Sequence, residues 1–552
     1  MAADDVRILG IEGTAWAASA AVHDTATGET VIETEAYQPE SGGIHPREAA
    51  EHMGEQVPEV VERALAIARE MHDGDGPPVD AVAFSRGPGL GPCLRIVGTA
   101  ARALSQRLDV PLVGVNHMVA HLEIGRHESG FDSPVCLNAS GANAHVLGYR
   151  NGRYRVLGET MDTGVGNAID KFTRHLGWSH PGGPKVEEAA RDGEYVDLPY
   201  VVKGMDFSFS GIMSAAKQAV DQGETVEDVC FGLQETVFAM LTEVSERALS
   251  LTGSDELVLG GGVGQNRRLQ AMLGEMCDQR GADFYAPDDR FLRDNAGMIA
   301  VLGAKMLAAG DTIPVADSAI DPDFRPDEVP VTWRSGEAVG KRRRDDREVQ
   351  GAEATVTIAD DRVVKRRLPR SYRHPRLDER LRRERTREEA RLTSEARRHG
   401  VPTPVLYDAD VRETTLVFEH VGDRDLRDAL TESRVRDVGR HLATIHAAGF
   451  VHGDPTTRNV RVGGGDSGAT GGAGSDDADG GGRTYLIDFG LGYYTDDVED
   501  YAMDLHVLAQ SLAGTADDPE ALLDAAETAY RSVGDGAVVD HLREIEGRGR
   551  YQ

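Results

Sequence analysis

Short apolar runs alternate with longer stretches of helical periodicity through the first 325 residues. Val6 to Ile11 form one such run, and Ala15 to His23 can return beside it as a hairpin partner. Between residues 48 and 70, apolar side chains recur at helical spacing, which predicts an amphipathic helix. The predicted elements are strands at 6–11, 15–23, 81–84, 112–115, 135–138 and 257–259, and helices at 48–70 and 94–108.

Glycine-rich turns follow three of the predicted strands. Their sequences are Gly10-Ile11-Glu12-Gly13-Thr14, Ser140-Gly141-Ala142-Asn143 and Gly260-Gly261-Gly262-Val263-Gly264. A strand that ends in such a turn brings backbone N–H groups to phosphate. One Gly-rich turn is common in proteins, whereas three in this setting predict a two-lobed α/β fold that clamps a nucleotide.

A length of 552 residues predicts two or three domains, and composition divides the chain into two. Residues 326–350 are polar, charged and weakly periodic, which predicts a linker between a domain at 1–325 and a domain at 351–552. Within the second domain, residues 463–482 are rich in Gly, Ser and Asp and cannot bury a core. We therefore expect a disordered surface insertion there.

The chain is strongly acidic, with a formal net charge of −33. We interpret this acidity as adaptation to high salt, and a general acidic interaction surface is the alternative. Only seven of the 60 basic residues are lysine, which agrees with the first interpretation. The screening length at molar salt is about 3 Å, so the acidity does not exclude a nucleic-acid partner.

Composition also excludes several classes of protein. No apolar run approaches the roughly 18 residues that a membrane span needs, so we expect no membrane partner. The first residues lack the basic and apolar regions of a secretory signal, and we expect a cytoplasmic protein. The four cysteines lie far apart, which argues against a disulfide framework and against a CxxC metal site.

Two histidines, His117 and His121, are spaced so that both lie on one face of a helix. This spacing suits a single metal ion, and two partly buried, hydrogen-bonded histidines are the alternative. A metalloprotease needs a Glu after the first histidine as general base, whereas Met118 stands there and cannot take a proton. We predict a metal site that holds a ligand, with Asp294 as a further acidic metal ligand.

Three motifs of the second domain follow the order found in protein kinases. Lys365 is the single lysine of residues 342–552, and its strand context predicts a contact with ATP phosphates; a plain surface role is the alternative. Asp454 and Asn459 have the spacing of a kinase catalytic loop, and a DFG sequence begins at Asp488. Asp454 would accept the proton of the substrate hydroxyl. Asn459 and Asp488 would hold Mg²⁺.

Other parts of a typical kinase are missing or ambiguous. Glu388 and Glu389 both lie in the Arg-rich helix after Lys365, and we favour Glu389 as the ion-pair partner of that lysine. No Gly-x-Gly-x-x-Gly loop precedes Lys365, no arginine precedes Asp454, and no Ala-Pro-Glu follows the DFG sequence. With a length of about 200 residues, the domain is short for a protein kinase.

Residues 6 to about 326 resemble the universal tRNA threonylcarbamoyladenosine transferase, the catalytic subunit of the KEOPS complex. The motifs cover the whole domain: Ile8 to Thr14, Gly87 to Leu90, Asn116 to His121, Asp162 to Asp170, Pro181 to Glu187, Phe207 to Gly211, Gly261 to Asn266, and Asp294-Asn295. The resemblance implies an actin/Hsp70/sugar-kinase fold. It also implies transfer of threonylcarbamoyl from threonylcarbamoyl-AMP to N6 of the adenosine 3′ of the anticodon, in tRNAs that read codons beginning with A.

The resemblance implies functional residues, position by position. His117, His121 and Asp294 match the ligands of one iron or zinc ion. The residues expected to line the adenylate are Asn138, Ala139, Ser140, Gly141, Ala142, Asp170, Gly183, Glu187 and Asn266. The sequence departs from the family at Asn138, where the family has a metal-binding tyrosine, so the fourth metal position and the metal's identity stay open.

The second domain resembles the small atypical serine/threonine kinase of the same complex. The matching segments are Lys365-Arg366-Arg367, Tyr372 to Asp378, Arg385 to Arg391 and Arg548-Gly549-Arg550. The resemblance implies an ATPase that uses ATP and Mg²⁺ to support tRNA modification. It also implies two partner subunits, a small dimerisation subunit and one that binds the kinase.

The segment 362–398 carries 14 arginines and Lys365 against six acidic residues. One interpretation is a solvated helix with i, i+4 ion pairs, and the other is a contact with tRNA phosphates.

Three hypotheses for the whole chain follow. The leading one is a transferase fused to its supporting kinase or ATPase. The alternatives are a signalling Ser/Thr kinase with a nucleotide-binding sensor domain, and an assembly scaffold that uses nucleotide only to set its conformation.

Overall fold

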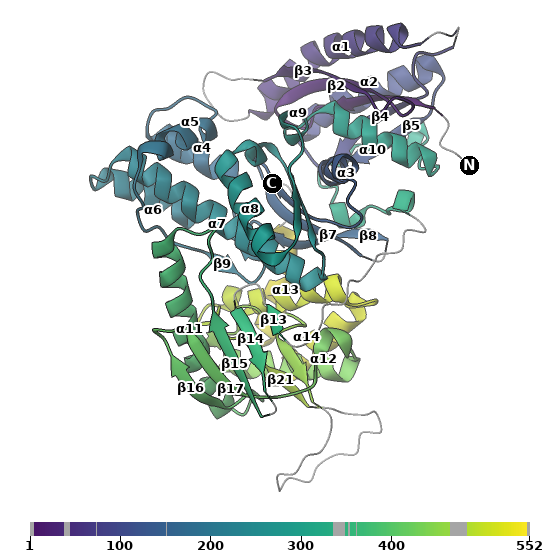
Figure 1. Cartoon of the computed structure of the whole chain (residues 1–552). Coiled ribbons are helices and arrows are strands. Elements are labelled where there is room, and N and C mark those ends of the chain that lie inside the picture. The colour runs from purple at the N-terminus through teal and green to yellow at the C-terminus, as the bar shows by residue number, and fades with distance from the viewer. Residues whose placement is uncertain are drawn as a thin grey trace.

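A computed structural model describes residues 5–37, 45–72, 74, 76–150, 152–334, 348–350, 354–359, 361–463 and 483–548 of the protein. Residues 5–334 are called the N-terminal half below, and residues 348–548 the C-terminal half. The N-terminal half has two lobes, and the C-terminal half lies against the second of them (Figure 1). Every helix within the described ranges is too short or too polar to cross a bilayer.

The first lobe is built on a five-stranded sheet between two layers of helices. Its elements are β1 Arg7–Glu12, β2 Ala17–Asp24, β3 Thr30–Ala36, α1 Pro46–Glu70, β4 Ala81–Gly87, α2 Gly91–Leu108, β5 Leu112–Asn116, α3 His117–Ser129 and α10 Ala296–Ala308. The strand order is β3-β2-β1-β4-β5: β1 to β3 form an antiparallel meander, and β4 and β5 run parallel to β1. Alternate residues of β1 enter different cores, since Leu9 and Ile11 pack with α1 and α2, and Ile8 packs with α10.

The second lobe repeats this topology. Its elements are β6 Val135–Ala139, β7 Ala144–Arg150, β8 Arg153–Glu159, α4 Val165–His175, α5 Gly183–Ala189, β9 Val202–Lys203, β10 Asp206–Phe207, α6 Ser210–Asp221, α7 Val226–Thr252, β11 Glu256–Gly260, α8 Arg267–Arg280, β12 Asp283–Tyr285 and α9 Asp289–Leu292. The order β12-β11-β6-β7-β8 again joins an antiparallel meander to two parallel strands. Two lobes of one topology confirm the predicted two-lobed, actin-like α/β fold of the N-terminal half.

The predicted linker begins later than its polar composition suggested. Residues 326–334 form two 3₁₀ turns, Pro326–Glu328 and Thr332–Arg334, which carry Val329 and Val331 into a core of the N-terminal half. The Arg334 guanidinium lies 3.7 Å from the ring centroid of Tyr149. The predicted linker start at 326 is therefore wrong. Val329 and Val331 are buried, but two apolar residues are too few to show a periodic pattern in the sequence. Residues 335–347 lie outside the described part of the chain.

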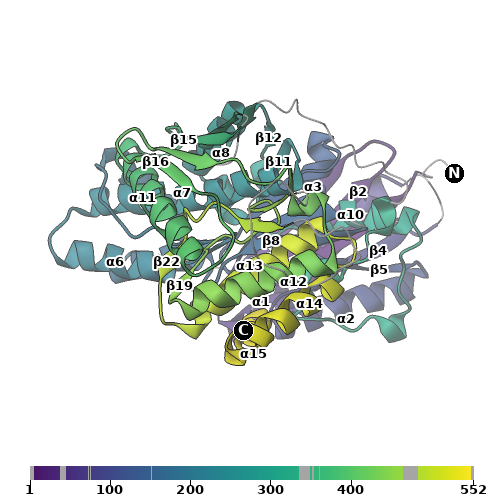
Figure 2. The same cartoon turned by 90° about the horizontal axis from the view of Figure 1, so that it is seen from below.

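The C-terminal half combines an antiparallel sheet with a group of helices (Figure 2). Its elements are β13 Glu348–Gln350, β14 Ala354–Ile358, β15 Arg362–Arg367, α11 Pro375–Arg398, β16 Leu406–Asp410, β17 Thr415–Glu419, β18 Arg424–Asp425, α12 Glu432–Ala447, β19 Phe450–Val451, β20 Val460–Val462, β21 Thr484–Leu486, β22 Tyr493–Tyr494, α13 Val498–Thr515, α14 Pro519–Val533 and α15 Gly536–Arg548. The main sheet has the order β13-β14-β15-β17-β16.

The predicted insertion lies between two paired strands. β20 and β21 pair antiparallel, and the N–H of Gly463 donates to the carbonyl oxygen of Arg483 at 3.0 Å. The remainder of the predicted insertion, residues 464–482, lies outside the described ranges.

Two buried carboxylates of α7 join the halves. Glu243 accepts from Arg373 at 2.5 Å and from Arg385 at 3.0 Å, both in the C-terminal half, and from Arg247 of its own helix at 2.7 Å. Glu246, one turn further along α7, pairs with Arg370 at 3.2 Å. Because both carboxylates are almost fully buried, their charge depends on these arginines.

The Arg-rich segment therefore has two faces. Its inner arginines are buried against acidic residues, as described for Glu243 and Glu246. On the outer face of α11, Arg383 pairs with Glu379 and Arg391 with Glu388, as expected of a solvated, ion-paired helix. The tRNA contact stays a prediction.

We predict that Glu243→Gln lowers the free energy of unfolding by about 3–5 kcal/mol, because it leaves buried arginines without their counter-charge. Chemical denaturation followed by tryptophan fluorescence measures the loss. The matched control is Glu379→Gln, which removes the exposed pair with Arg383 and should cost at most about 1 kcal/mol. Equal costs for the two variants would contradict this account of the interface.

Candidate functional site

The first turn of α3 brings the two predicted histidines together. Asn116 caps the helix by accepting the N–H groups of Met118 and Val119, so α3 begins at His117 and places His121 one turn later. The Nε2 atoms of His117 and His121 lie 3.3 Å and 3.2 Å from Oδ1 of Asp294. The three candidate ligand atoms lie within 4.8 Å of one another, which suits one metal ion.

Asp294 reaches the histidines because α10 packs closely on β1. An added Cβ at Gly10 would stand 2.4 Å from the carbonyl oxygen of Ala296, so only glycine permits this approach. Ser19 of β2 accepts the N–H of Ala296 at 3.1 Å, which holds the start of α10 in place. Asp294 comes two residues before Ala296, where α10 begins, so the start of this helix positions the Asp294 carboxylate.

Glu12 adds a carboxylate that the sequence analysis did not single out. It is buried, one oxygen lies 3.1 Å from Nδ1 of His117, and the other accepts the N–H of Thr14. Burial opposes charge on His117, but Glu12 and Asp294 outweigh it and raise the pKa of His117 to about 10. The contact leaves Nε2 of His117 for a metal, as carboxylate–histidine–metal arrangements require. Glu12 lies in the Gly-rich turn at 10–14, but its contact with His117 of α3 cannot be inferred from that turn.

Asn138 presents an unsatisfied oxygen beside the same cluster. Its side chain is buried, and within the described residues its Oδ1 has no hydrogen-bond partner. An added Cβ at Gly260 would stand 3.3 Å from this oxygen and 3.4 Å from Cβ of His121. A buried amide oxygen without a partner is unfavourable, and its place near His121 makes it a candidate for a further oxygen ligand of a metal at the cluster.

The turn at 140–142 is held against the start of α4. The N–H of Asn167 donates to the carbonyl oxygen of Gly141 at 2.9 Å. An added Cβ at Gly166 would stand 2.7 Å from Cα of Gly141, so the glycine permits this contact. Gly141 and Ala142 remain exposed, with their backbone available to a ligand.

The other predicted adenylate residues continue from this turn. Oδ1 of Asp170 on α4 accepts the N–H of Gly182 at 2.7 Å, just before α5. Glu187 on α5 accepts the N–H of Arg267 at 3.1 Å, and Asn266 caps the same end of α8. Hydrogen bonds thus connect the segments that carry all nine predicted residues. We call these residues the adenylate rim: Asn138, Ala139, Ser140, Gly141, Ala142, Asp170, Gly183, Glu187 and Asn266. An added Cβ at Gly183 would meet open space.

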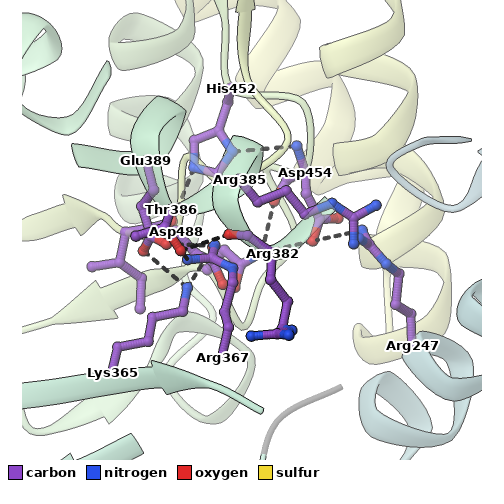
Figure 3. A network of polar contacts seen from close by, with 12 residues as sticks. Arg247, Lys365, Arg367, Arg382, Arg385, Thr386, Glu389, His452, Asp454 and Asp488 are labelled. Carbon is purple, nitrogen blue, oxygen red and sulfur yellow. Dashed lines mark hydrogen bonds and ion pairs between the residues drawn. The ribbon is translucent and has the colours of Figure 1, made fainter. Parts of the chain in front are cut away.

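The predicted phosphoryl-transfer residues line one cavity of about 300 Å³. Its wall includes Lys365, Glu389, Asp454, Asn459 and Asp488. Figure 3 shows most of these side chains converging from β15, α11 and the loops after β19 and β21. The structure therefore brings together all five residues that were predicted from separate motifs.

Lys365 is held between two carboxylates. Its Nζ lies 2.9 Å from Oε1 of Glu389 and 2.6 Å from Oδ1 of Asp488. The second oxygen of Glu389 binds Arg367 at 2.6 Å, a partner that the sequence analysis did not identify. Glu388 instead lies 3.9 Å from Arg391. Glu389 is therefore the residue that pairs with Lys365.

The catalytic loop is fixed by short local contacts. Nδ2 of Asn459 donates to Oδ2 and to the carbonyl oxygen of Asp454, both at 2.9 Å. Burial lowers the pKa of His452, which keeps its ring neutral. Its Nε2 donates to the carbonyl oxygen of Ile487 at 3.0 Å, and its Nδ1 accepts the N–H of Asp454. His452 thereby joins the loop to the strand that leads to Asp488.

The N-terminal half contributes to this cavity. Met205, Arg247, Ser250 and Leu251 lie in its wall. Nη1 of Arg247 is 3.6 Å from Oδ2 of Asp454. No sequence signal marked these residues, because they belong to a helix and a loop more than 200 positions before the catalytic loop.

Comparison with known proteins agrees with the resemblance found in the sequence. Residues 25–301 match the family tRNA N6-adenosine threonylcarbamoyltransferase. A "Probable bifunctional tRNA threonylcarbamoyladenosine biosynthesis protein" of Haloarcula marismortui is 73% identical, covering 99% of this chain and 100% of that protein. Proteins of the same name are 71% identical in Halobacterium salinarum and 49% identical in Methanospirillum hungatei, each covering 99% of both chains.

We predict that His117→Ala and His121→Ala each remove bound metal, because each deletes one ligand of a three-residue cluster. Elemental analysis of the purified protein measures the loss. The matched control is His127→Ala, also on α3 but outside the cluster, which should keep full metal content. Full occupancy in the His117→Ala, His121→Ala double variant would rule out this site.

Proposed function

Because the chain belongs to the family of bifunctional tRNA threonylcarbamoyladenosine biosynthesis proteins, we propose that its two halves carry the two activities. The N-terminal half transfers threonylcarbamoyl from threonylcarbamoyl-AMP to N6 of the adenosine 3′ of the tRNA anticodon. The C-terminal half is an ATP- and Mg²⁺-dependent ATPase and serine/threonine kinase that supports this reaction. The meeting of His117, His121 and Asp294 beside the adenylate rim carries the proposal for the transferase.

In this proposal the adenylate rim binds the AMP portion of the donor. The exposed backbone at Gly141 and Ala142 can donate N–H groups to the phosphate. Asp170 and Glu187 supply carboxylate oxygens for ribose hydroxyls. AMP is then a good leaving group for attack by the weakly nucleophilic exocyclic amine of adenosine.

His117, His121 and Asp294 would hold the iron or zinc ion, with Oδ1 of Asn138 as the fourth donor. An ion bound there would supply Lewis-acid stabilisation of charge on the carbamoyl oxygen. Glu12 orients His117 by holding its Nδ1, and the N-cap at Asn116 keeps both histidines on one face. The buried position of the histidines limits access of water to the cluster.

In the C-terminal half, Lys365 would contact the phosphates of ATP while Glu389 holds its ammonium group in place. Asn459 and Asp488 would bind Mg²⁺, and Asp454 would accept the proton of the attacking hydroxyl or water. The kinase-like sheet and the shared cavity support this assignment. We further propose that the chain acts in the cytoplasm with the other KEOPS subunits.

The proposed function predicts separable activities. Asp454→Ala and Asp488→Ala should abolish ATP hydrolysis but leave the iron or zinc content of the N-terminal half unchanged, because the two sites share no ligand. A single round of transfer from threonylcarbamoyl-AMP should also persist, whereas tRNA modification over many cycles should be lost in the complex with its partner subunits. Mass spectrometry of tRNA nucleosides and phosphate release measure the two activities.

Two outcomes would contradict the proposal. Absence of threonylcarbamoyladenosine from tRNA treated with the wild-type complex and threonylcarbamoyl-AMP would refute the transferase. Wild-type rates over many cycles with Asp454→Ala, in the absence of ATP hydrolysis, would show that the C-terminal half does not support the reaction.

A further inference from the structure

Phosphoryl transfer needs positive charge around the group that moves. Charge spreads over three equatorial oxygens of the transferred phosphoryl group, and kinases and ATPases neutralise it with metal ions and basic side chains. Between Asp454 and Asn459, the catalytic loop offers one basic residue, Arg458. Its Nη1 donates to the carbonyl oxygen of Ser250, so the loop places no cation of its own at Asp454.

The other basic side chains of the cavity wall occupy different places. The cationic residues that line it are Arg247, Lys365, Arg458 and Arg461. Lys365 lies between Glu389 and Asp488, where it would meet the inner phosphates of the nucleotide. Arg461 is paired with Asp425 at 2.5 Å. Arg247, in contrast, has its guanidinium 3.6 Å from the carboxylate of Asp454.

Glu243 holds Arg247 in this position. Nη2 of Arg247 binds Oε1 of Glu243 at 2.7 Å, while Nη1 faces Asp454 at 3.6 Å and the carbonyl oxygen of Gly204 at 3.3 Å. The side chain is 8% exposed, so the guanidinium has little freedom to leave the cavity. In Figure 3, Arg247 and Lys365 approach the acidic residues from opposite sides.

We propose that Arg247, supplied by the N-terminal half, is a catalytic residue of the nucleotide site in the C-terminal half. It contacts the terminal phosphoryl group of ATP during transfer. This inference rests on the proposed ATPase function of the C-terminal half. It makes the phosphoryl-transfer site a joint property of both halves, since α7 belongs to the lobe that carries the adenylate rim.

The step can be written with its atoms and electrons. The oxygen of a water molecule forms a bond to the γ-phosphorus while the bond from that phosphorus to the β–γ bridging oxygen breaks. The electron pair of the broken bond leaves with ADP. One proton of the water passes to the carboxylate of Asp454, and the other stays on the oxygen that is now bonded to phosphorus. Arg247 neutralises the charge that spreads over the equatorial oxygens of the transferred group.

The experiment measures ATP hydrolysis by the full-length chain with Mg²⁺. We expect Arg247→Ala to lower kcat by about 100-fold to 1,000-fold, the range found when one oriented donor to a transition-state oxyanion is removed. KM for ATP should change little, because Lys365 remains. Arg247→Lys should retain part of the rate. Guanidinium ion at millimolar concentration should restore part of the lost rate in Arg247→Ala.

Two controls separate chemistry from structure. Arg280→Ala breaks another ion pair of the same buried network, with Glu246 at 3.4 Å, but lies outside the cavity. It should keep the wild-type kcat. Asp454→Ala should lose hydrolysis and gain nothing from guanidinium, because its missing group is a carboxylate.

The outcomes distinguish the inference from the function on which it rests. If the wild-type chain hydrolyses no ATP, or Asp454→Ala hydrolyses it normally, the proposed ATPase function fails. If the wild type is active and Asp454→Ala is not, wild-type kcat in Arg247→Ala would overturn the role of Arg247. An equal loss in Arg280→Ala, without guanidinium rescue of Arg247→Ala, would overturn it as well, because the effect would be structural.

Discussion

The buried carboxylate of Glu243 is the interaction on which the arrangement of the two halves depends. A carboxylate without exposure is stable only when opposite charges surround it, and arginines from both halves do so. Arg385 lies one turn before Glu389 on α11, so the same contact positions the helix that orients Lys365. Arg247 connects the same carboxylate to Asp454. One buried charge thereby aligns both sides of the phosphoryl-transfer cavity.

The helix that carries Glu243 also reaches the adenylate rim. Gln234 of α7 accepts from Nδ2 of Asn266 at 3.2 Å, and Arg247 meets Asp454 thirteen positions later. At 1.5 Å per residue, these positions are about 20 Å apart along one helix. The two candidate sites therefore rest on a single rigid element. Energetic coupling between the adenylate rim and the phosphoryl-transfer cavity would require α7 to have two arrangements. Measuring how a ligand at one site changes affinity at the other would detect such coupling.

The structure explains the residue types found in the Arg-rich segment. The inner arginines of this segment meet buried glutamates at the interface, where a guanidinium can bind several oxygens at once. Lys365, the single lysine of residues 342–552, stands where a compact ammonium fits between two carboxylates in a cavity. Residue choice thus follows the local geometry and not only the overall composition.

The sequence alone determined the elements and the local motifs. Apolar patterns located six strands, four in the first lobe and two in the second, and the two helices α1 and α2 of the first lobe, since burial of one face imposes a regular spacing on neighbouring residues. The spacing of His117 and His121, and of Asp454 and Asn459, predicted that the members of each pair lie together, because a helical turn or a short loop relates them. Tertiary structure alone decided the place of Glu12 at His117, the unsatisfied oxygen of Asn138, and the contact of Arg247 with Asp454. These contacts join residues up to 207 positions apart, and no local pattern records them, because only the packing of separate elements brings such side chains together.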